Sequence, residues 1–224
     1  MGTTLTKPQT AKPETPAAEP QRHLGPFVRQ ILGRSDYAII SELIPPGSRV
    51  LDLGCGDGEL LEWLIEHKNV IARGIEIDSA KVQRAIARGV SVFQGDIDEG
   101  LTDYPDQVFD YVILSQTLQE TRRPLKVLRE MLRVGRHGIV AFPNFGHWSV
   151  RLSHLFSGRA PRTKLFPHAW YDSPNIHFLT IKDFEDLCKQ EGWTIERRIC
   201  LAGNHTVPLL ANLLAEVAVF MIRK

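Results

Sequence analysis

A cluster of glycines follows an acidic residue at one point of the chain, in the run DLGCGDG at 52–58. Glycines let the backbone turn sharply and let a ligand approach more closely than a Cβ atom would permit. If a helix begins directly after the run, its free N–H groups add hydrogen-bond donors. The run is not a P-loop, because no Gly-Lys-Ser or Gly-Lys-Thr follows, and Glu59 stands at the third glycine position of the dinucleotide-binding pattern. A tight turn without a ligand is the alternative interpretation.

Three acidic residues accompany the glycines at spacings that suit a nucleoside with a cationic arm. Glu76 comes about 20 residues after the glycines, where an acid binds the ribose hydroxyls in nucleotide-binding sheets, and a carboxylate can accept both hydroxyls of a diol. Asp96 is placed to accept from an adenine amino group, or it is merely a cap or turn residue. Asp52 precedes the first glycine and would face a cation rather than a phosphate. A diol, an amino-purine and an amine without phosphate together indicate S-adenosylmethionine.

These residues need a sheet that brings them to one edge, and the hydrophobic pattern predicts one. Apolar strands alternate with segments of helical spacing, which is typical of a parallel sheet covered on both faces. We predict an α/β fold, doubly wound, with a mostly parallel seven-stranded sheet and an antiparallel pair of strands at the carboxyl end. The predicted strands are 49–53, 70–77, 90–93, 109–114, 138–142, 193–199 and 216–222. In such a sheet the ligand lies at the carboxyl edge of the strands.

Four motifs together resemble those of class I S-adenosylmethionine-dependent methyltransferases: the glycine run, GIEID at 74–78, QGD at 94–96 and FDYVILS at 109–115. The resemblance implies a Rossmann-like fold and S-adenosyl-L-methionine or S-adenosyl-L-homocysteine as the bound cofactor. It implies that Asp52, Gly54, Gly56 and Gly58 hold the methionyl group, Glu76 the ribose, Asp96 and Ile97 the adenine, and that Ser115 and Gln116 face the sulfonium. Cys55 and Ile77, inside the same motifs, complete the candidate cofactor-binding residues.

Two longer stretches, FPNFGHW at 142–148 and WYDSPNIH at 170–177, resemble the MetW family of methionine biosynthesis. This resemblance covers about residues 33–224. Members of that family are associated with homoserine O-acyltransferase, so the resemblance implies a MetX-type enzyme as partner. The chain itself has no Gly-x-Ser-x-Gly nucleophile elbow and no evident Ser, His and acid triad, so the partner must carry the acyl-transfer serine.

The sequence offers no clear site for a methyl acceptor. After the strand at 109–114 the chain reads SQTL, without the Pro-Pro-aromatic signature of amino-methylating enzymes, and Gln119-Glu120 stand where many small-molecule methyltransferases have a histidine. His147 and His177 are candidate bases, but histidines beside aromatic residues are more often packing residues. Catalytic residues therefore stay unassigned. We expect an accessory or regulatory subunit of the acyltransferase, with an active methyltransferase on a small molecule as the alternative and an RNA-modifying enzyme as the third.

No acid occurs between Met131 and Tyr171. The basic residues Arg133, Arg136, Arg151, Arg159, Arg162 and Lys164 lie there among Phe145, Trp148, Phe156, Phe166 and Trp170. Arginine with aromatic residues is typical of a protein interface or of a single-stranded nucleic-acid groove. The alternative to a partner-binding surface is a lid over the cofactor pocket, with its aromatic residues packed inward and its arginines in solvent. We favour a protein partner and do not expect nucleic acid, because the net charge of the whole chain is only +1.

Composition limits the remaining possibilities. Four prolines and few large aliphatic residues predict a disordered tail at 1–24, followed by one methyltransferase-like domain at 25–224. The longest apolar runs are too short to cross a bilayer, so we expect no membrane partner and a cytoplasmic location. The three cysteines lack C-x-x-C spacing, which favours reduced thiols and argues against a metal cluster.

Overall fold

The computed structural model describes residues 34–224. The predicted tail at 1–24 and the domain boundary at residue 25 lie outside the described residues. The elements, in chain order, are α2 (Ser35–Leu43), β1 (Arg49–Leu53), α3 (Glu59–Lys68), β2 (Ile71–Glu76), α4 (Ser79–Ala87), β3 (Ser91–Gln94), η1 (Ile97–Glu99), β4 (Phe109–Ser115), η2 (Leu118–Glu120), α5 (Pro124–Val134), β5 (Gly135–Pro143), α6 (Trp148–Ser157), α7 (Ile181–Glu191), β6 (Thr194–Ala202), β7 (His205–Thr206), α8 (Ala211–Leu214) and β8 (Val217–Arg223).

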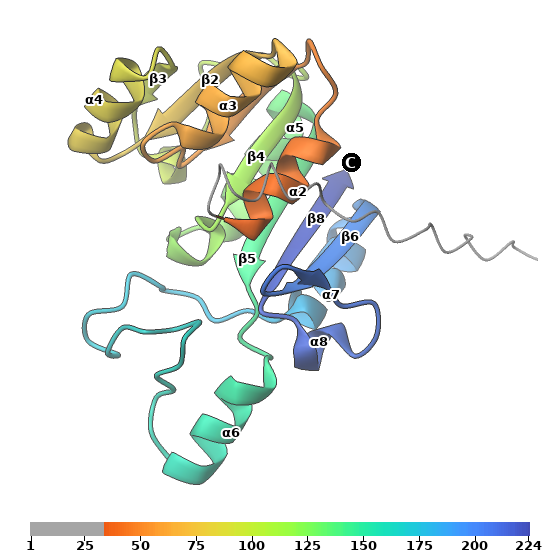
Figure 1. The fold of residues 1–224 in the computed structure, drawn as a ribbon. Coiled ribbons are helices and arrows are strands. Elements are labelled where there is room, and N and C mark those ends of the chain that lie inside the picture. The colour runs from red at the N-terminus through yellow and green to blue at the C-terminus, as the bar shows by residue number, and fades with distance from the viewer. Residues whose placement is uncertain (1–33) are drawn as a thin grey trace, which may run out of the picture.

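The strands form one sheet in the order β3-β2-β1-β4-β5-β8-β6-β7 (Figure 1). The first five strands of this order pair in parallel, while β8 lies antiparallel to both β5 and β6. All seven predicted strands are present, including the antiparallel pair at the carboxyl end. The structure adds β7, whose two residues pair with the end of β6. It also starts β5 at Gly135, three residues before the predicted start, because α5 leads into that strand directly.

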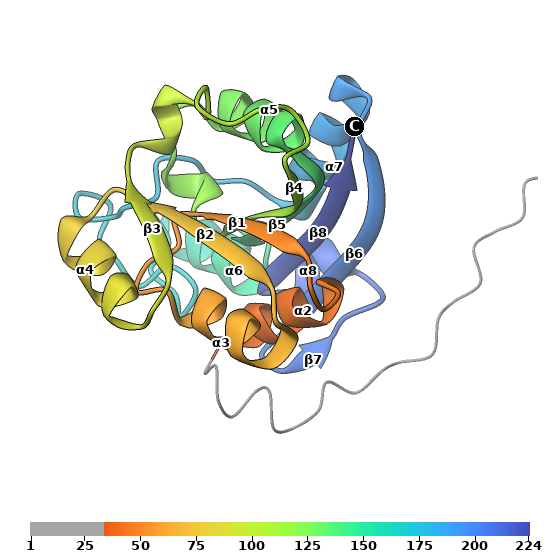
Figure 2. The same cartoon turned by 90° about the horizontal axis from the view of Figure 1, so that it is seen from above.

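Helices cover both faces of the sheet (Figure 2). On one face, α2 and α3 bury Ile40, Leu61 and Leu64 against side chains from β1, β4 and β5. On the other face, α5 and α7 pack against the alternate side chains of the same strands. Phe184 of α7 contacts both Phe142 and Phe220, with ring centroids 5.2 and 4.8 Å away. Two separate apolar clusters therefore hold the central strands from both sides, as a doubly wound sheet requires.

Local capping signals set where several helices begin. Pro124 occupies the first turn of α5, where its missing N–H costs nothing. The Asp78 carboxylate accepts from two N–H groups of α4. Thr180 and Asp183 form a reciprocal capping box at α7. The α3 helix instead begins after Gly58, at φ +78°, so that its first turn follows the glycine run without a break.

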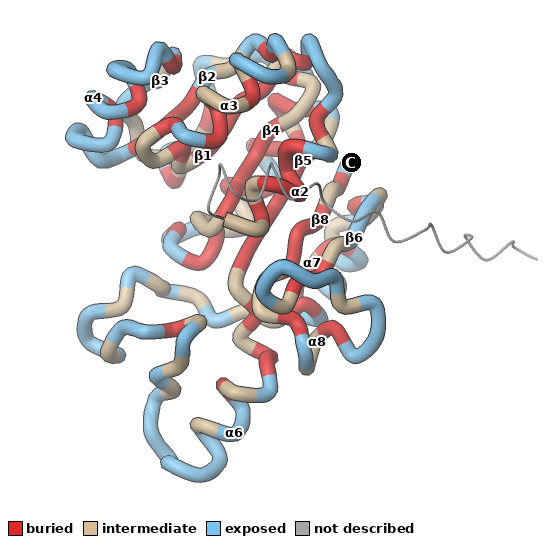
Figure 3. The backbone as a smooth tube through the Cα atoms, in the orientation of Figure 1, coloured by how far each residue is buried: buried red, intermediate tan, exposed pale blue. Residues whose placement is uncertain are grey.

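One part of the chain stands apart from the two layers. The α6 helix extends beyond the carboxyl end of β5, and the chain then loops back toward the end of β4 before α7 begins (Figure 1). Most of this excursion is exposed or half-buried (Figure 3). It is closed at its base, where the Phe145 N–H donates to the Leu179 carbonyl at 3.0 Å. We call residues 146–178 the arm. No helix within residues 34–224 has the length and apolar character to cross a membrane.

Candidate functional site

A cavity of about 750 Å³ lies at the carboxyl ends of β1, β2 and β4. Eight of the eleven residues predicted to bind the cofactor line it: Gly54, Gly56, Glu76, Ile77, Asp96, Ile97, Ser115 and Gln116. The parallel topology explains this gathering, since strands that are far apart in sequence end side by side. The other three, Asp52, Cys55 and Gly58, are not part of the lining.

The three loop glycines have different structural roles, although all have positive φ. A Cβ atom on Gly56 would meet nothing within 4 Å, so this residue borders open space in the cavity wall. A Cβ atom on Gly54 would lie 2.6 Å from the Thr117 hydroxyl, and one on Gly58 would lie 2.9 Å from the Ala85 Cβ. Gly54 therefore permits the close approach of the β4–η2 turn, and Gly58 the packing of α3 on α4. Only Gly56 leaves room for a ligand.

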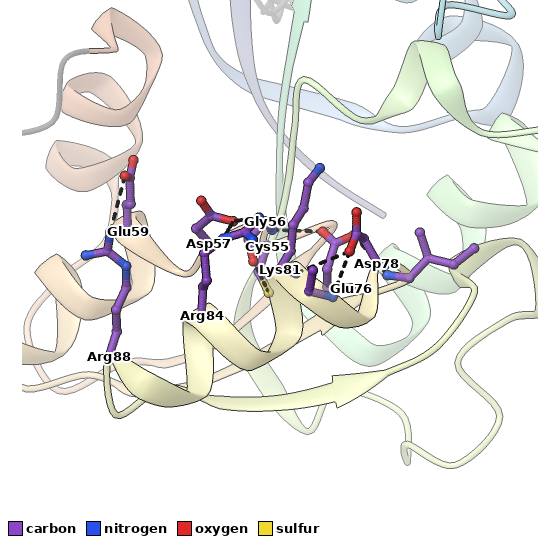
Figure 4. Close-up of polar contacts among 11 residues, drawn as sticks. Cys55, Gly56, Asp57, Glu59, Glu76, Asp78, Lys81, Arg84 and Arg88 are labelled. Carbon is purple, nitrogen blue, oxygen red and sulfur yellow. Dashed lines mark hydrogen bonds and ion pairs between the residues drawn. The ribbon is translucent and has the colours of Figure 1, made fainter.

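The Glu76 carboxylate is held in place by backbone donors (Figure 4). Its Oε2 accepts from the Gly56 N–H at 2.9 Å, and its Oε1 accepts from Ile77 and Asp78 N–H groups, each at 3.0 Å. The side chain is buried, and it forms no ion pair with a cation within residues 34–224. Three of its roughly four acceptor positions are therefore filled. One acceptor position on Oε2 is therefore left for a donor such as a ligand hydroxyl.

Ion pairs connect α4 to the glycine run and to α3 (Figure 4). Arg84 donates to the Asp57 carboxylate at 3.0 Å, and Arg88 contacts Glu62 at 2.6 Å and Glu59 at 3.5 Å. These contacts are exposed, so each contributes little to stability by itself. The Arg84–Asp57 pair joins the glycine run to the helix that follows Glu76, so the two motifs are held at a fixed distance from each other.

Asp96 acts as a cap, and it also lines the cavity. One carboxylate oxygen accepts from the Asp98 N–H at 2.9 Å at the start of η1, and the other pairs with the Arg122 guanidinium. Both alternatives considered for Asp96 are thus compatible with its position, because a capping carboxylate keeps spare acceptor capacity. Arg122 was not singled out from the sequence. It comes from the turn after η2, and only the fold brings it to the cavity.

A polar network that the sequence did not reveal closes the end of the cavity near β1. Arg34 pairs with Asp36 and donates to the Tyr37 hydroxyl at 2.8 Å and the Ser115 hydroxyl at 3.1 Å. The Ser115 hydroxyl in turn donates to Asp36 at 2.8 Å. Arg34 is the N-cap residue of α2, and Asp36 and Tyr37 lie in its first turn. This helix precedes the glycine run and carries no recognisable motif. Ser115, predicted to face the sulfonium, is therefore already engaged with the α2 carboxylate.

Asp52 lies behind the glycine run and is buried. Burial raises the pKa of its carboxyl to about 7, with the nearby Glu76 and Asp36 carboxylates adding to the rise and the Arg34 charge opposing it. A carboxyl with this pKa is poised to ionise when a cation arrives. Asp52 does not line the cavity, so its charge would act on a bound amine from behind the cavity wall.

Cys55 faces the core instead of the cavity. Its side chain is buried beneath the loop, and a Cβ atom on Gly74 would lie 2.4 Å from its Sγ. Burial raises the pKa of the thiol, with Asp52 and Glu76 contributing, so the nucleophilic thiolate is disfavoured. Within residues 34–224, no three His, Cys, Asp or Glu side chains gather closely enough to hold a metal ion.

The two histidines considered as bases are not part of the cavity lining. His147 caps α6, with its Nδ1 2.7 Å from the Ser149 hydroxyl, and burial lowers the pKa of its ring. The Nε2 of His177 is buried without a hydrogen-bond partner. Glu120 does line the cavity, and burial raises the pKa of its carboxyl. Gln119 supports this turn by donating to the Gln116 carbonyl at 2.7 Å.

The aromatic residues of the basic segment divide into two sets. Phe145, at the base of the arm, packs with Phe166 and Phe178, with ring centroids 4.6 to 6.4 Å apart, although Phe178 itself stays exposed. The outward set is exposed: Trp148, Phe156, Trp170 and Tyr171. Ile176 is the arm residue that lines the cavity, and the Ile176 and His177 N–H groups donate to the Gln119 carbonyl at 2.8 and 3.0 Å. The arm thus borders the cavity at Ile176, and most of its aromatic residues are exposed.

Comparison with known proteins agrees with this architecture. The sequence profile of the family described as "Methionine biosynthesis protein MetW" matches residues 34–222. The chain belongs to the MetW family. A "Bifunctional methionine biosynthesis protein MetXA/MetW" of Rhodopirellula baltica is 38% identical over 176 residues, which are 73% of this chain and 28% of the relative. This MetW-family chain therefore spans less than a third of the length of that relative.

Solved structures share the fold at low sequence identity. A SAM-dependent methyltransferase from Archaeoglobus fulgidus superposes with a TM-score of 0.62 at 16% identity, covering 88% of this chain and 98% of the other. The [4+2]-cyclase SpnF gives a TM-score of 0.60 at 18% identity, covering 84% and 80%. The fold is thus the Rossmann-like methyltransferase fold predicted from the sequence. Because a cyclase shares it, the fold alone does not determine the reaction.

Proposed function

We propose that this MetW-family chain binds S-adenosyl-L-methionine or S-adenosyl-L-homocysteine in the cavity at the carboxyl edge of the sheet. The cavity volume of about 750 Å³ suits a ligand of this size. Glu76, held by three backbone N–H groups, would accept from the ribose, and Asp96 from the adenine amino group. Ile77 and Ile97 would contact the base, while Gly56 leaves open space beside the loop.

The methionyl end would lie toward Asp52 and the α2 network. Asp52 would ionise opposite the amine, and the Arg34 guanidinium, which lines the cavity and is paired with Asp36, would face the carboxylate. Ser115 and Gln116 would border the sulfonium, the group that supplies an electrophilic methyl when the methylated form is bound. All these residues bind and orient, and a histidine base is not among the residues that line the cavity.

We further propose that the chain is an accessory or regulatory subunit of a homoserine O-acyltransferase of the MetX type. The observation that carries this proposal is a cavity equipped for the cofactor while both candidate histidine bases lie outside its lining. The name of the Rhodopirellula baltica relative, which joins MetXA and MetW in one chain, also supports it. Binding of the cofactor would then act as a signal, because a ligand that prefers one assembly state shifts the equilibrium toward it. An assembly of this kind would operate in the cytoplasm.

The test combines the full chain with the homoserine O-acyltransferase of the same organism. Acyl transfer is measured with and without the chain and with and without S-adenosylmethionine, while S-adenosylhomocysteine is followed in the same tubes. We expect the chain to change the acyl-transfer rate without turnover of the cofactor. No association and no change in rate would refute the accessory role.

A methyltransferase acting on a small molecule is the second candidate, and Glu120 is the observation that favours it. This carboxyl lines the cavity and its pKa is raised by burial, so it could accept a proton from an acceptor. The expected signature is S-adenosylhomocysteine formation that requires a metabolite, ignores the acyltransferase and falls sharply in Glu120→Gln. Turnover unchanged by this substitution would remove Glu120 from that role.

A further inference from the structure

The α6 helix presents an apolar stripe to solvent. Its large exposed side chains are Trp148, Leu152, Leu155 and Phe156, at positions i, i+4, i+7 and i+8. Since each residue turns the helix by about 100°, these four share one face. The side chains of Leu155 and Phe156 are 73% and 82% exposed. A helix of a globular domain normally turns such a stripe toward the core.

The domain holds α6 by the opposite face. Val150 is the residue of α6 that is buried, and the helical period places it on the side away from the stripe. Arg151 secures the same region by donating to the Gly146 carbonyl at 2.6 Å. The stripe is therefore directed outward by the packing of the helix. A solvent-facing stripe at this spacing is the pattern of a helix that docks in an apolar groove.

The charge around the stripe restricts what can cover it. Arg151, Arg159, Arg162 and Lys164 surround α6 and its outgoing loop, and no ion pair with a carboxylate is recorded for them within residues 34–224. A second copy of the chain, related by two-fold symmetry, would bring these cations together and repel. A partner with carboxylates around an apolar groove would pair with them.

We propose that the stripe of α6 is the surface that docks into an apolar, carboxylate-rimmed groove of the homoserine O-acyltransferase. This inference rests on the accessory function proposed above and names the part of the chain that would make the contact. Trp148 and Phe156 would be the anchors, since aromatic residues surrounded by arginine are enriched at the energetic centres of interfaces. The helix lies on the same edge of the sheet as the cofactor cavity, and the rest of the arm reaches the cavity at Ile176.

Two double variants of the full chain test the surface. L155S/F156S removes apolar area from the stripe, and the matched control I71S/I86S removes exposed side chains from β2 and α4, at the other end of the molecule. Affinity for the purified acyltransferase is measured by biolayer interferometry. We expect at least about tenfold weaker binding for L155S/F156S, the loss typical of anchor residues, and a change of less than about twofold for the control. Circular dichroism and calorimetric affinity for S-adenosylhomocysteine should stay unchanged in both.

The outcomes separate the surface from the accessory function. If the wild-type chain does not bind the acyltransferase, the accessory function and this inference both fall. If the wild type binds and L155S/F156S binds equally well, the surface is wrong and the accessory function stands. Light scattering that shows a dimer of the chain alone, lost in L155S/F156S, would assign the stripe to self-association. Flotation with anionic phospholipid vesicles, lost in the same variant, would assign it to a lipid surface, and both results would overturn the proposal.

Discussion

Replacing Glu76 with alanine would remove the carboxylate proposed to bind the ribose. The same change takes the acceptor away from the N–H groups of Gly56, Ile77 and Asp78. These groups lie at the cavity, so water would hydrate them once the side chain is gone. The fold should therefore survive, and the effect should appear in the affinity for the cofactor.

The hydrogen bonds of Glu76 determine the expected magnitude. Its Oε1 already accepts twice and its Oε2 once, which leaves about one acceptor position for a ribose hydroxyl. A single hydrogen bond to a charged group contributes about 1.5–3 kcal/mol. Two new bonds would contribute about twice as much. We therefore expect the loss of one, which weakens binding roughly 10- to 150-fold.

Isothermal titration calorimetry of S-adenosylhomocysteine gives the affinities directly. Glu76→Gln should be weakened less than Glu76→Ala, because its amide oxygen can still accept. Glu62→Ala is the matched control, since this carboxylate pairs with Arg88 outside the cavity. Equal affinity of Glu76→Ala and wild type would show that Glu76 does not bind the ribose. A loss far above 150-fold would show that the carboxylate accepts both hydroxyls and that the backbone donors give way.

Three further predictions concern the loop, the buried acid and the core. Gly56→Val should abolish measurable cofactor binding. Gly203→Val is the control, because this glycine also has positive φ and open space around it, so the variant should bear similar backbone strain and still bind the cofactor normally. Equal affinity of the two variants would show that the ligand does not bind beside Gly56. Because the pKa of Asp52 is raised to about 7, the folded chain holds a proton that the unfolded chain has lost, so the unfolding free energy without ligand should fall as pH rises from about 4 to 7. Urea titrations of Asp52→Asn should lack this decline, and an identical slope would contradict it. Phe184→Ala should cost about 3–5 kcal/mol of unfolding free energy. A loss under about 1 kcal/mol would mean that the packing of Phe184 on Phe142 and Phe220 contributes little to the stability of the core.

The fold was predictable because its pattern is local and repeats. Each parallel strand is an apolar run between helical spacings, so the strand identities follow from periodicity alone. The start of β5 could not be predicted in this way, because Gly135, Arg136 and His137 show no apolar alternation. Pairing with β4, where Gly135 lies opposite Phe109, extends the strand there. The two residues of β7 are too few to show any period.

The candidate site was predictable only where its residues follow the ends of strands. Gly56, Glu76 and Asp96 lie at such ends, and the parallel topology brings them together. Arg34, Asp36 and Tyr37 come from a helix that precedes the first strand, and their contact with Ser115 depends on packing across the sheet. The stripe of α6 is visible as a helical spacing, but a spacing predicts a buried face by default. Its outward direction depends on Val150, which only the tertiary structure reveals.

Because the arm is closed at its base, changes in its sequence and length are separated from changes in the cofactor cavity. The hydrogen bond between Phe145 and Leu179 holds the ends of residues 146–178 together, so insertions or deletions between them would leave the sheet and the cavity strands in place. The entropy of closing a loop grows slowly with its length, and extra residues there would cost little stability. Relatives could thus acquire new recognition surfaces in this segment while the glycine run and its acids stay fixed. Exchanging the segment between relatives is accordingly a practical way to transfer partner choice without redesigning the domain.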